Sequence, residues 1–277
     1  MAPVLKWARG LTRRAPLVPL QFPTSGFKVV PDLELLEEQH FDEFEAGHYY
    51  PMNIGDVLAS KYQVIGKLGF GSTSTVWLGQ NLMTHDHVAL KVYTRDQGSQ
   101  DEFRFLDTIR KANPSHPGYP HVRTPLDIFE LSRPGGDHYC LVQRPMWDSW
   151  KDLLRRNSSG YLKADNILQD IADQSILEAF TKSELASPSV RKFVGDATIY
   201  ESRTFDLPRK FGGPVLSDFG AAVRGDLKRN HDAQPAVYRS PEVMLKTEWS
   251  YPVDIWNVGA MVRSRHVFVT LFSLGDD

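Results

Sequence analysis

The stretch "LGFGSTSTVWLGQNLMTHDHVALKV" runs from Leu68 to Val92 and contains the features that decide the fold. Apolar and polar residues alternate on both sides of its turn-rich "THDH", which predicts three antiparallel strands in a meander over residues 62–94. Gly69 and Gly71 lie between the first two strands, where glycine lets backbone N–H groups approach a phosphate. Alone this signal is weak, because a glycine-containing hairpin needs no ligand and the GK[ST] ending of a P-loop is absent.

A lysine in the third predicted strand strengthens the interpretation that the glycine hairpin approaches a phosphate. "VALKV" places Lys91 inside an apolar strand, where an ammonium group needs a counter-charge or a phosphate. A structural lysine held in a salt bridge is the alternative. Glu102 opens a helix predicted over residues 101–112 and is a candidate partner. A glycine loop, a strand lysine and a helical glutamate are together typical of the nucleotide-binding half of a protein kinase.

Further motifs follow in kinase order. They are "KADNIL" with Lys163 and Asn166, "SDFGAAV" with Asp218, "YRSPEV" with Glu242, and "DIWNVG". "FGGPVL" before Asp218 predicts a strand, residues 149–157 predict a short helix, and residues 252–262 predict a buried helix. This order predicts an α+β, two-lobed protein-kinase-like fold with a β-rich N-lobe and an incomplete helical C-lobe.

The sequences of these motifs resemble one kinase family more specifically than they resemble protein kinases in general. "YYPMNIGDVLASKYQVIGKLGFGSTSTVWLG", "KADNIL" and "PAVYRSPEVML" resemble the SR-protein kinases, in particular their fungal relatives, over about residues 49–261. The segment between Asn166 and Asp218 is long, as in that branch. The resemblance implies a serine/threonine protein kinase that uses ATP and Mg²⁺ and phosphorylates Arg/Ser-rich splicing factors.

The resemblance also implies roles for single residues. Its ATP-binding set is Leu68, Gly69, Gly71, Val76, Ala89, Lys91, Glu102, Gln143 and Met146. Within that set Lys91 pairs with the α- and β-phosphates and with Glu102, Gln143 occupies the gatekeeper position, and Met146 ends the hinge. Asn166 and Asp218 would hold Mg²⁺, Lys163 would neutralise the transferring phosphate, and Glu242 would anchor the activation segment.

One residue of the family's catalytic loop is missing. The loop places an aspartate two residues before the lysine, and here Tyr161 precedes Lys163 at that distance. A tyrosine has a pKa near 10 and stays protonated, so it cannot accept the proton of the substrate hydroxyl. We therefore expect impaired catalysis. A non-catalytic pseudokinase that serves as an interaction protein, or a defective splice product, are the alternatives.

The segment that leads into this catalytic loop is short. About 16 residues separate Met146 from Lys163, where the family has a short and a long helix. We expect an internal deletion near residues 157–161 and a truncated end after Val262. The predicted domains are an arm over residues 1–48, disordered and basic and then acidic at the surface, an N-lobe with hinge over 49–146, a partial C-lobe over 147–262, and an unrelated tail over 263–277.

Composition and charge limit which other classes of protein the chain could belong to. Among 277 residues the formal net charge is -2, which argues against a nucleic-acid-binding protein. No apolar run approaches the roughly 20 residues of a membrane span. The lone Cys140 lies in an apolar run and is predicted to be a buried thiol in a reducing compartment. We expect a cytoplasmic or nuclear monomer, and favour a disordered basic arm over a mitochondrial targeting segment.

Overall fold

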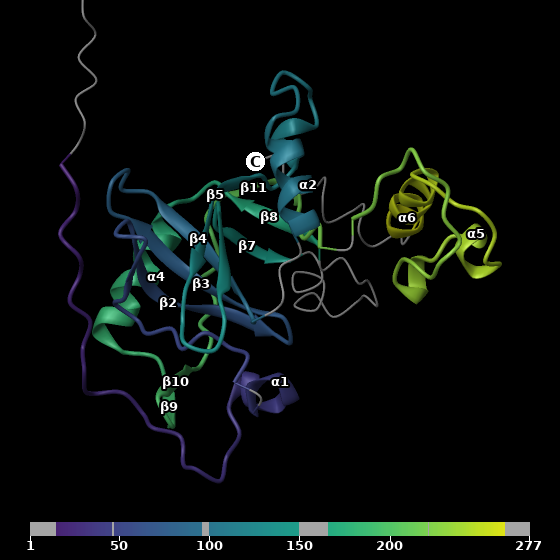
Figure 1. Ribbon diagram of the computed structural model, residues 1–277. Coiled ribbons are helices and arrows are strands. Elements are labelled where there is room, and N and C mark those ends of the chain that lie inside the picture. The colour runs from purple at the N-terminus through teal and green to yellow at the C-terminus, as the bar shows by residue number, and fades with distance from the viewer. Residues whose placement is uncertain (1–14, 46, 96–99, 150–165, 221, 264–277) are drawn as a thin grey trace, which may run out of the picture. The chain divides into compact units, whose positions relative to one another are not determined.

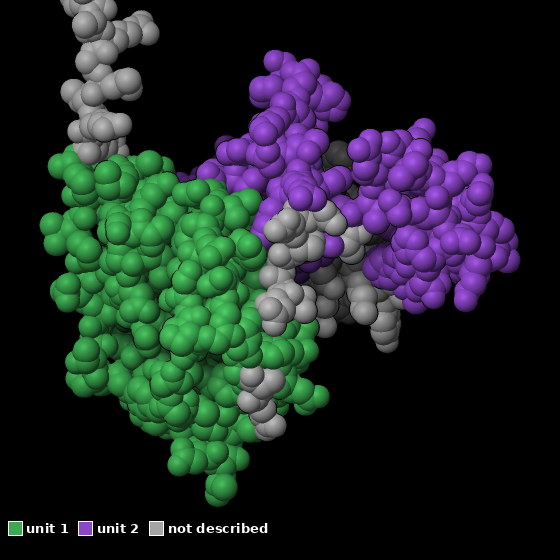
Figure 2. Space-filling model, viewed as in Figure 1, with its two compact units in different colours: residues 1–96, 127–142, 177–204 green, residues 97–126, 143–176, 205–277 purple. Residues whose placement is uncertain are grey.

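The computed structural model describes residues 15–45, 47–95, 100–149, 166–220 and 222–263 of the chain (Figure 1). These residues form two compact units, coloured separately in Figure 2. Unit 1 comprises Met1–Asp96, Asp127–Val142 and Leu177–Thr204, and unit 2 comprises Gln97–Leu126, Gln143–Ile176 and Phe205–Asp277. No helix in the described part of the chain is both long and apolar enough to cross a membrane.

Unit 1 is built on a twisted antiparallel sheet. Its strands follow the order β1-β2-β3-β4-β6-β5, and their bounds are β1 Val57–Leu58, β2 Tyr62–Gly71, β3 Ser74–Asn81, β4 His87–Tyr93, β5 Pro125–Leu131 and β6 His138–Gln143. The predicted meander over residues 62–94 is thus confirmed as β2, β3 and β4. One face of this sheet covers a core cluster that includes Trp77, Leu90 and Val142. Cys140 belongs to this cluster and is fully buried, as predicted.

The N-terminal arm, predicted as a disordered segment, is described from Ala15 onward as extended chain. The backbone N–H of Leu17 donates to Leu82, and Gln63 exchanges two hydrogen bonds with the backbone of Leu20. A 3-10 helix η1 (Glu37–His40) and the short helix α1 (Asp42–Glu45) follow. The acidic stretch was expected at the surface, yet Glu38 is buried, because it pairs with the buried Lys67.

A segment from much later in the chain completes unit 1. This segment contains helix α4 (Ser175–Ala186) and the hairpin of β9 (Arg191–Val194) and β10 (Ala197–Tyr200), and Tyr200 at the end of β10 joins the core cluster. Gly66 in β2 permits this packing, since a Cβ there would lie 2.8 Å from the ring of Phe180 in α4. Residues of the predicted C-lobe therefore build the sheet unit.

Unit 2 contains a smaller antiparallel sheet in the order β11-β8-β7. Its strands are β7 Met146–Ser149, β8 Ile167–Ile171 and β11 Phe211–Leu216, so the strand predicted before Asp218 is present. Its helices are α2 Gln100–Arg110, α5 Pro241–Met244 and α6 Pro252–Arg263, with 3-10 turns η2 Tyr119–His121 and η3 Ala236–Tyr238. The helix expected over residues 149–157 falls almost entirely outside the described residues.

Helix α6 differs from its prediction as a buried helix. Val253 packs with Val243 and Trp249, but Ile255, Trp256 and Val258 are each at least half exposed. An apolar composition favours burial only where other apolar surface is available to cover it. The described part of unit 2 contributes only this small cluster to the helix.

Candidate functional site

The glycine-rich hairpin and the strand lysine lie in one row across the sheet of unit 1. Gly69 in β2 stands opposite Val76 in β3, and Val76 stands opposite Lys91 in β4. Leu78 and Ala89 form the next such pair on the same face. Directly opposed residues of antiparallel strands point to the same side of a sheet. The residues predicted to cover a nucleotide therefore share one face.

This face lies opposite the core of unit 1. Neighbouring residues in β3 and β4, including Trp77, Leu90 and Val92, point into the core cluster. A Cβ built on Gly69 would meet no described atom within 4 Å, which leaves open space above the hairpin. Lys91 is half-buried, and its ammonium lies 4.7 Å from the ring centroid of Tyr93 on the same strand. Open space beside a half-buried cation suits an anionic ligand.

Unit 2 carries the residues predicted for the hinge. Gln143 ends β6, is buried, and donates from Nε2 to the carbonyl of Arg123 at 3.4 Å. Met146 begins β7, is buried, and pairs with Asp170 in β8. The backbone from the predicted gatekeeper to the end of the hinge is thus fixed by neighbours within unit 2.

The two predicted metal ligands come from adjacent strand ends. Asn166 immediately precedes β8, Asp218 follows β11 by two residues, and Leu216 pairs with Ile167 between them. The backbone N–H of Ser217 donates to the carbonyl of Asn166 at 2.8 Å. Both side chains are exposed. Amide and carboxylate oxygens are ligands that Mg²⁺ accepts, with phosphate oxygens and water filling other positions, so this pair fits a magnesium ion held together with a nucleotide.

A second carboxylate lies beside this pair. A Cβ on Gly220 would be 3.4 Å from a carboxylate oxygen of Glu102 and 3.6 Å from one of Asp218. The rings of Phe105 in α2 and Phe219 lie 5.9 Å apart between centroids. Helix α2 is therefore packed on the Asp218–Gly220 turn, with Glu102 buried at its start. Glu102 and Lys91 belong to different units, and their pairing stays a prediction.

Arg123 is a site residue that sequence reasoning missed. Its guanidinium donates twice to the carbonyl of Arg144, at 2.7 Å and 3.1 Å, and once to the hydroxyl of Ser217 at 3.4 Å. Burial, and then the charge of Arg144, lower the pKa of Arg123 to about 10, while Asp218 acts in the opposite direction. Arg123 thus joins the hinge to the turn that carries Asp218. No signal in "HVRTP" distinguishes it from a surface arginine.

The catalytic loop cannot be placed in the same way. Lys163 and Tyr161 lie outside the described residues, so the role of the first and the substitution by the second remain predictions from the sequence. Glu242 lies exposed at the start of α5, where its carboxylate makes no ion pair with any described residue. Within the described ranges no group of three His, Cys, Asp or Glu side chains could hold a metal ion by itself.

The fold of the chain has a counterpart among solved proteins. The chain matches the crystal structure of a kinase domain with a TM-score of 0.53 and 20% identity, covering 76% of this chain and 66% of that one. At this identity the match shows the fold alone. The α+β kinase fold predicted from the motifs is confirmed.

Relatives at the sequence level narrow the family, although no family model matches the chain. It is 38% identical over 283 residues to a serine/threonine protein kinase of Aspergillus fumigatus, covering 92% of this chain and 71% of the relative. It is 26% identical over 286 residues to the serine/threonine-protein kinase SRPK of Physarum polycephalum, covering 83% and 66%. A stretch of 112 residues, 38% of this chain and 20% of the relative, is 36% identical to mouse SRSF protein kinase 3. The chain belongs to the SRPK-like family of serine/threonine protein kinases.

Proposed function

We propose that this chain binds ATP with Mg²⁺ and that it transfers the γ-phosphoryl group only weakly. The observation that carries the proposal is the backbone hydrogen bond between Ser217 and Asn166, which sets the oxygen ligands of Asn166 and Asp218 at neighbouring strand ends. Magnesium held there supplies charge neutralisation at the phosphates. In unit 1, the open space above Gly69 and the half-buried Lys91 in the same row support binding of the phosphate groups themselves.

Weak transfer follows from the sequence of the catalytic loop. A correctly placed general base contributes about 10²- to 10⁴-fold in rate, and Tyr161 stands where the family has its aspartate. Positioning and electrostatic stabilisation carry most of the catalysis in phosphoryl transfer, so a residual rate is compatible with the loss. A chain that binds nucleotide without transferring phosphate is the second candidate, favoured by the same tyrosine.

Arg/Ser-rich proteins are the proposed substrate or partner class. The support is the likeness to kinases named SRPK and SRSF protein kinase 3. A monomer in the cytoplasm or nucleus is the form we propose for this activity.

Radiolabelled ATP, Mg²⁺ and an Arg/Ser-rich peptide test the proposal directly, with the Lys91→Met variant as control. Binding is measured beside it as the rise in melting temperature on adding ATP with Mg²⁺. We expect nucleotide-dependent stabilisation of the unchanged chain that Lys91→Met reduces, with transfer near the level of the control. Transfer well above the control would identify an active enzyme. Stabilisation that is absent from both chains would exclude nucleotide binding.

A further inference from the structure

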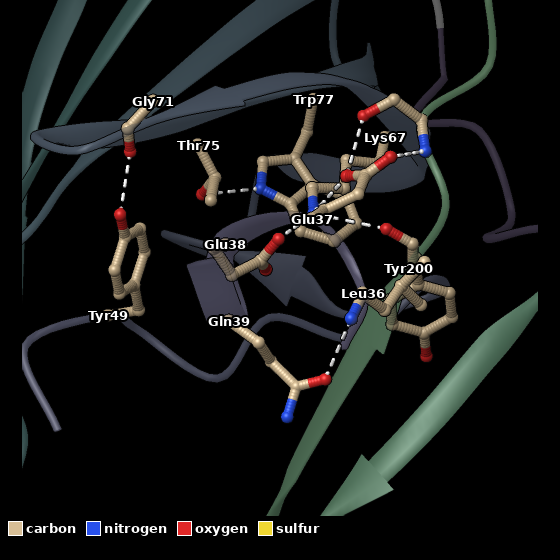
Figure 3. A network of polar contacts seen from close by, with 11 residues as sticks. Leu36, Glu37, Glu38, Gln39, Tyr49, Lys67, Gly71, Thr75, Trp77 and Tyr200 are labelled. Atoms are coloured by element: carbon tan, nitrogen blue, oxygen red, sulfur yellow. Dashed lines mark hydrogen bonds and ion pairs between the residues drawn. The ribbon is translucent and has the colours of Figure 1, made fainter. Parts of the chain in front are cut away.

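The glycine-rich strand carries a lysine that the family roles leave unused. Lys67 in β2 immediately precedes the loop and its side chain is fully buried. Its ammonium pairs with the carboxylates of Glu37, at 2.7 Å, and Glu38, and donates to the carbonyl of Tyr200 at 3.0 Å (Figure 3). Two carboxylates and a carbonyl thus satisfy a cation that could not otherwise remain buried.

The partners of Lys67 come from two distant parts of the chain. Glu37 and Glu38 belong to η1, and the Glu37 carboxylate also accepts from the hydroxyl and backbone N–H of Ser202. The backbone N–H of Arg203 donates to the carbonyl of Lys67 at 2.8 Å. The N-terminal arm, the glycine-rich strand and the segment after β10 are therefore joined at one residue.

The contacts continue along the glycine loop itself. We call Leu36–Phe44 together with Tyr49 the N-terminal brace. Beyond Lys67, the brace places the ring of Phe41 edge-on to that of Phe70, with centroids 6.1 Å apart. The hydroxyl of Tyr49 then donates to the carbonyl of Gly71 at 2.7 Å (Figure 3). The brace thus contacts the strand at three successive points that lead into the hairpin tip.

These contacts lie where the glycine loop has few side chains of its own to fix its conformation. Glycine loses much conformational freedom on ordering, and Gly69 and Gly71 contribute no side chains to fix the hairpin. Burial, and then the charges of Glu38 and Glu43, raise the pKa of Tyr49 to about 12, so its hydroxyl remains a donor across the physiological range. The bond from Tyr49 to Gly71 is therefore available as a support from outside the loop throughout that range.

From this geometry we infer that the N-terminal brace is a positioning element for the nucleotide phosphates, acting through Lys67 and Tyr49 on the glycine loop. The inference rests on the proposed ATP binding. A brace that keeps the loop in its binding conformation raises the fraction of competent molecules, and the apparent dissociation constant varies inversely with that fraction. Loosening the brace weakens nucleotide binding without touching a residue that contacts nucleotide.

Tyr49→Phe is the cleanest test, because it removes one hydroxyl and keeps the ring. The measurements are the dissociation constant for ATP with Mg²⁺ and, without nucleotide, amide hydrogen exchange over residues 69–75. We expect affinity to fall about 2- to 10-fold, the effect of one hydrogen bond, and exchange of these amides to accelerate. Tyr119→Phe is the matched control, since the Tyr119 hydroxyl donates to the carbonyl of Arg110 in unit 2.

Two results would overturn the inference. The first is amide exchange over residues 69–75 that is the same in Tyr49→Phe as in the original chain. This result would exclude a positioning role even if the original chain binds no nucleotide and the proposed function fails. The second is faster exchange with unaltered affinity in a chain that does bind nucleotide, because the brace would then hold the loop without serving the ligand.

The ion-pair part of the brace needs a separate variant. Replacing Lys67 alone would leave two buried carboxylates and could unfold the chain. The triple variant Lys67→Met, Glu37→Gln, Glu38→Gln removes every charge of the cluster together. We expect it to fold and to show the same faster exchange and weaker binding as Tyr49→Phe. A folded triple variant with exchange and affinity like those of the unchanged chain would remove Lys67 from the positioning role.

Discussion

Asn166 and Ser217 are joined backbone to backbone by a 2.8 Å hydrogen bond, across the ends of two strands that are far apart in the sequence. This contact brings Asn166 and the "SDFG" turn to the same end of a three-stranded sheet. The nearness of the two predicted magnesium ligands follows from the pairing of β8 and β11.

Replacing Asp218 by asparagine tests that ligand pair. Asp218 has a φ of 60°, a left-handed conformation that asparagine also enters readily, so the change removes a charge without adding strain. We expect the magnesium-dependent part of nucleotide stabilisation to disappear, measured as the melting temperature with ATP in the presence and absence of Mg²⁺. Asp226→Asn, an exposed partner of Arg224, is the control. Equal magnesium dependence in both variants would contradict the assignment.

Replacing Arg123 by methionine tests the connection between the predicted hinge and the turn that carries Asp218. The change leaves the carbonyl of Arg144 and the hydroxyl of Ser217 without their donor. We expect the free energy of unfolding to fall by about 1–3 kcal/mol, the usual cost of unpaired buried polar groups. Urea denaturation measures it, and Arg224→Met at an exposed ion pair should leave the free energy of unfolding nearly unchanged. Equal losses of unfolding free energy in the two variants would show that Arg123 does not join Arg144 to Ser217.

The acid sensitivity of unit 1 depends in part on His138. This residue is buried, its Nδ1 lies 3.0 Å from the carbonyl of Tyr93, and burial lowers its pKa, helped by the charges of Arg133 and Arg95. Unfolding therefore takes up a proton below the ordinary histidine pKa of about 6.5. The stabilising contribution is complete above that value and is lost as the pH falls through it towards the lower folded pKa.

The corresponding experiment compares urea unfolding at about pH 7.5 and about pH 5.5, on either side of the ordinary histidine pKa. We expect the unchanged chain to lose more stability between the two than His138→Gln does. His116→Gln, at an exposed histidine, is the control. A pH dependence that His138→Gln leaves intact would assign the acid sensitivity to other groups.

The thiol of Cys140 should be chemically silent in the folded chain. It is fully buried in the core cluster, and burial raises its pKa, so neither access nor ionisation favours reaction. We expect no modification by a thiol-specific disulfide reagent at about pH 8, and complete reaction in guanidinium. The exposed Ser187→Cys variant should react at once. Rapid labelling of the native single thiol would show that the core opens.

Local patterns predicted the parts of the fold that depend on neighbours in sequence. Alternation gave β2, β3 and β4, and the motif order gave the strand before Asp218. The row of Gly69, Val76 and Lys91 follows from that meander once its register is known. The row of residues proposed to cover a nucleotide could therefore be foreseen, because hairpins bring residues that are close in sequence together.

Long-range pairing escaped prediction. Nothing in "KLGFG" indicates that Lys67 is buried, because its counter-charges lie in η1 and its carbonyl partner, Tyr200, ends β10. Arg123 owes its role to the carbonyl of Arg144, a backbone atom with no signature in sequence. The prediction that α6 is buried was wrong, since periodicity reports an apolar helix but not the surface that covers it.

The position of Tyr200 in the core of unit 1 has a consequence for biosynthesis. A nascent chain emerging from the ribosome has all six strands of its sheet by Gln143, yet the ring that packs against Trp77 and the carbonyl that accepts from Lys67 have still to be translated. Folding of this unit must wait for a later stretch of the message. Until that stretch has been made, the core of the sheet lacks the ring of Tyr200.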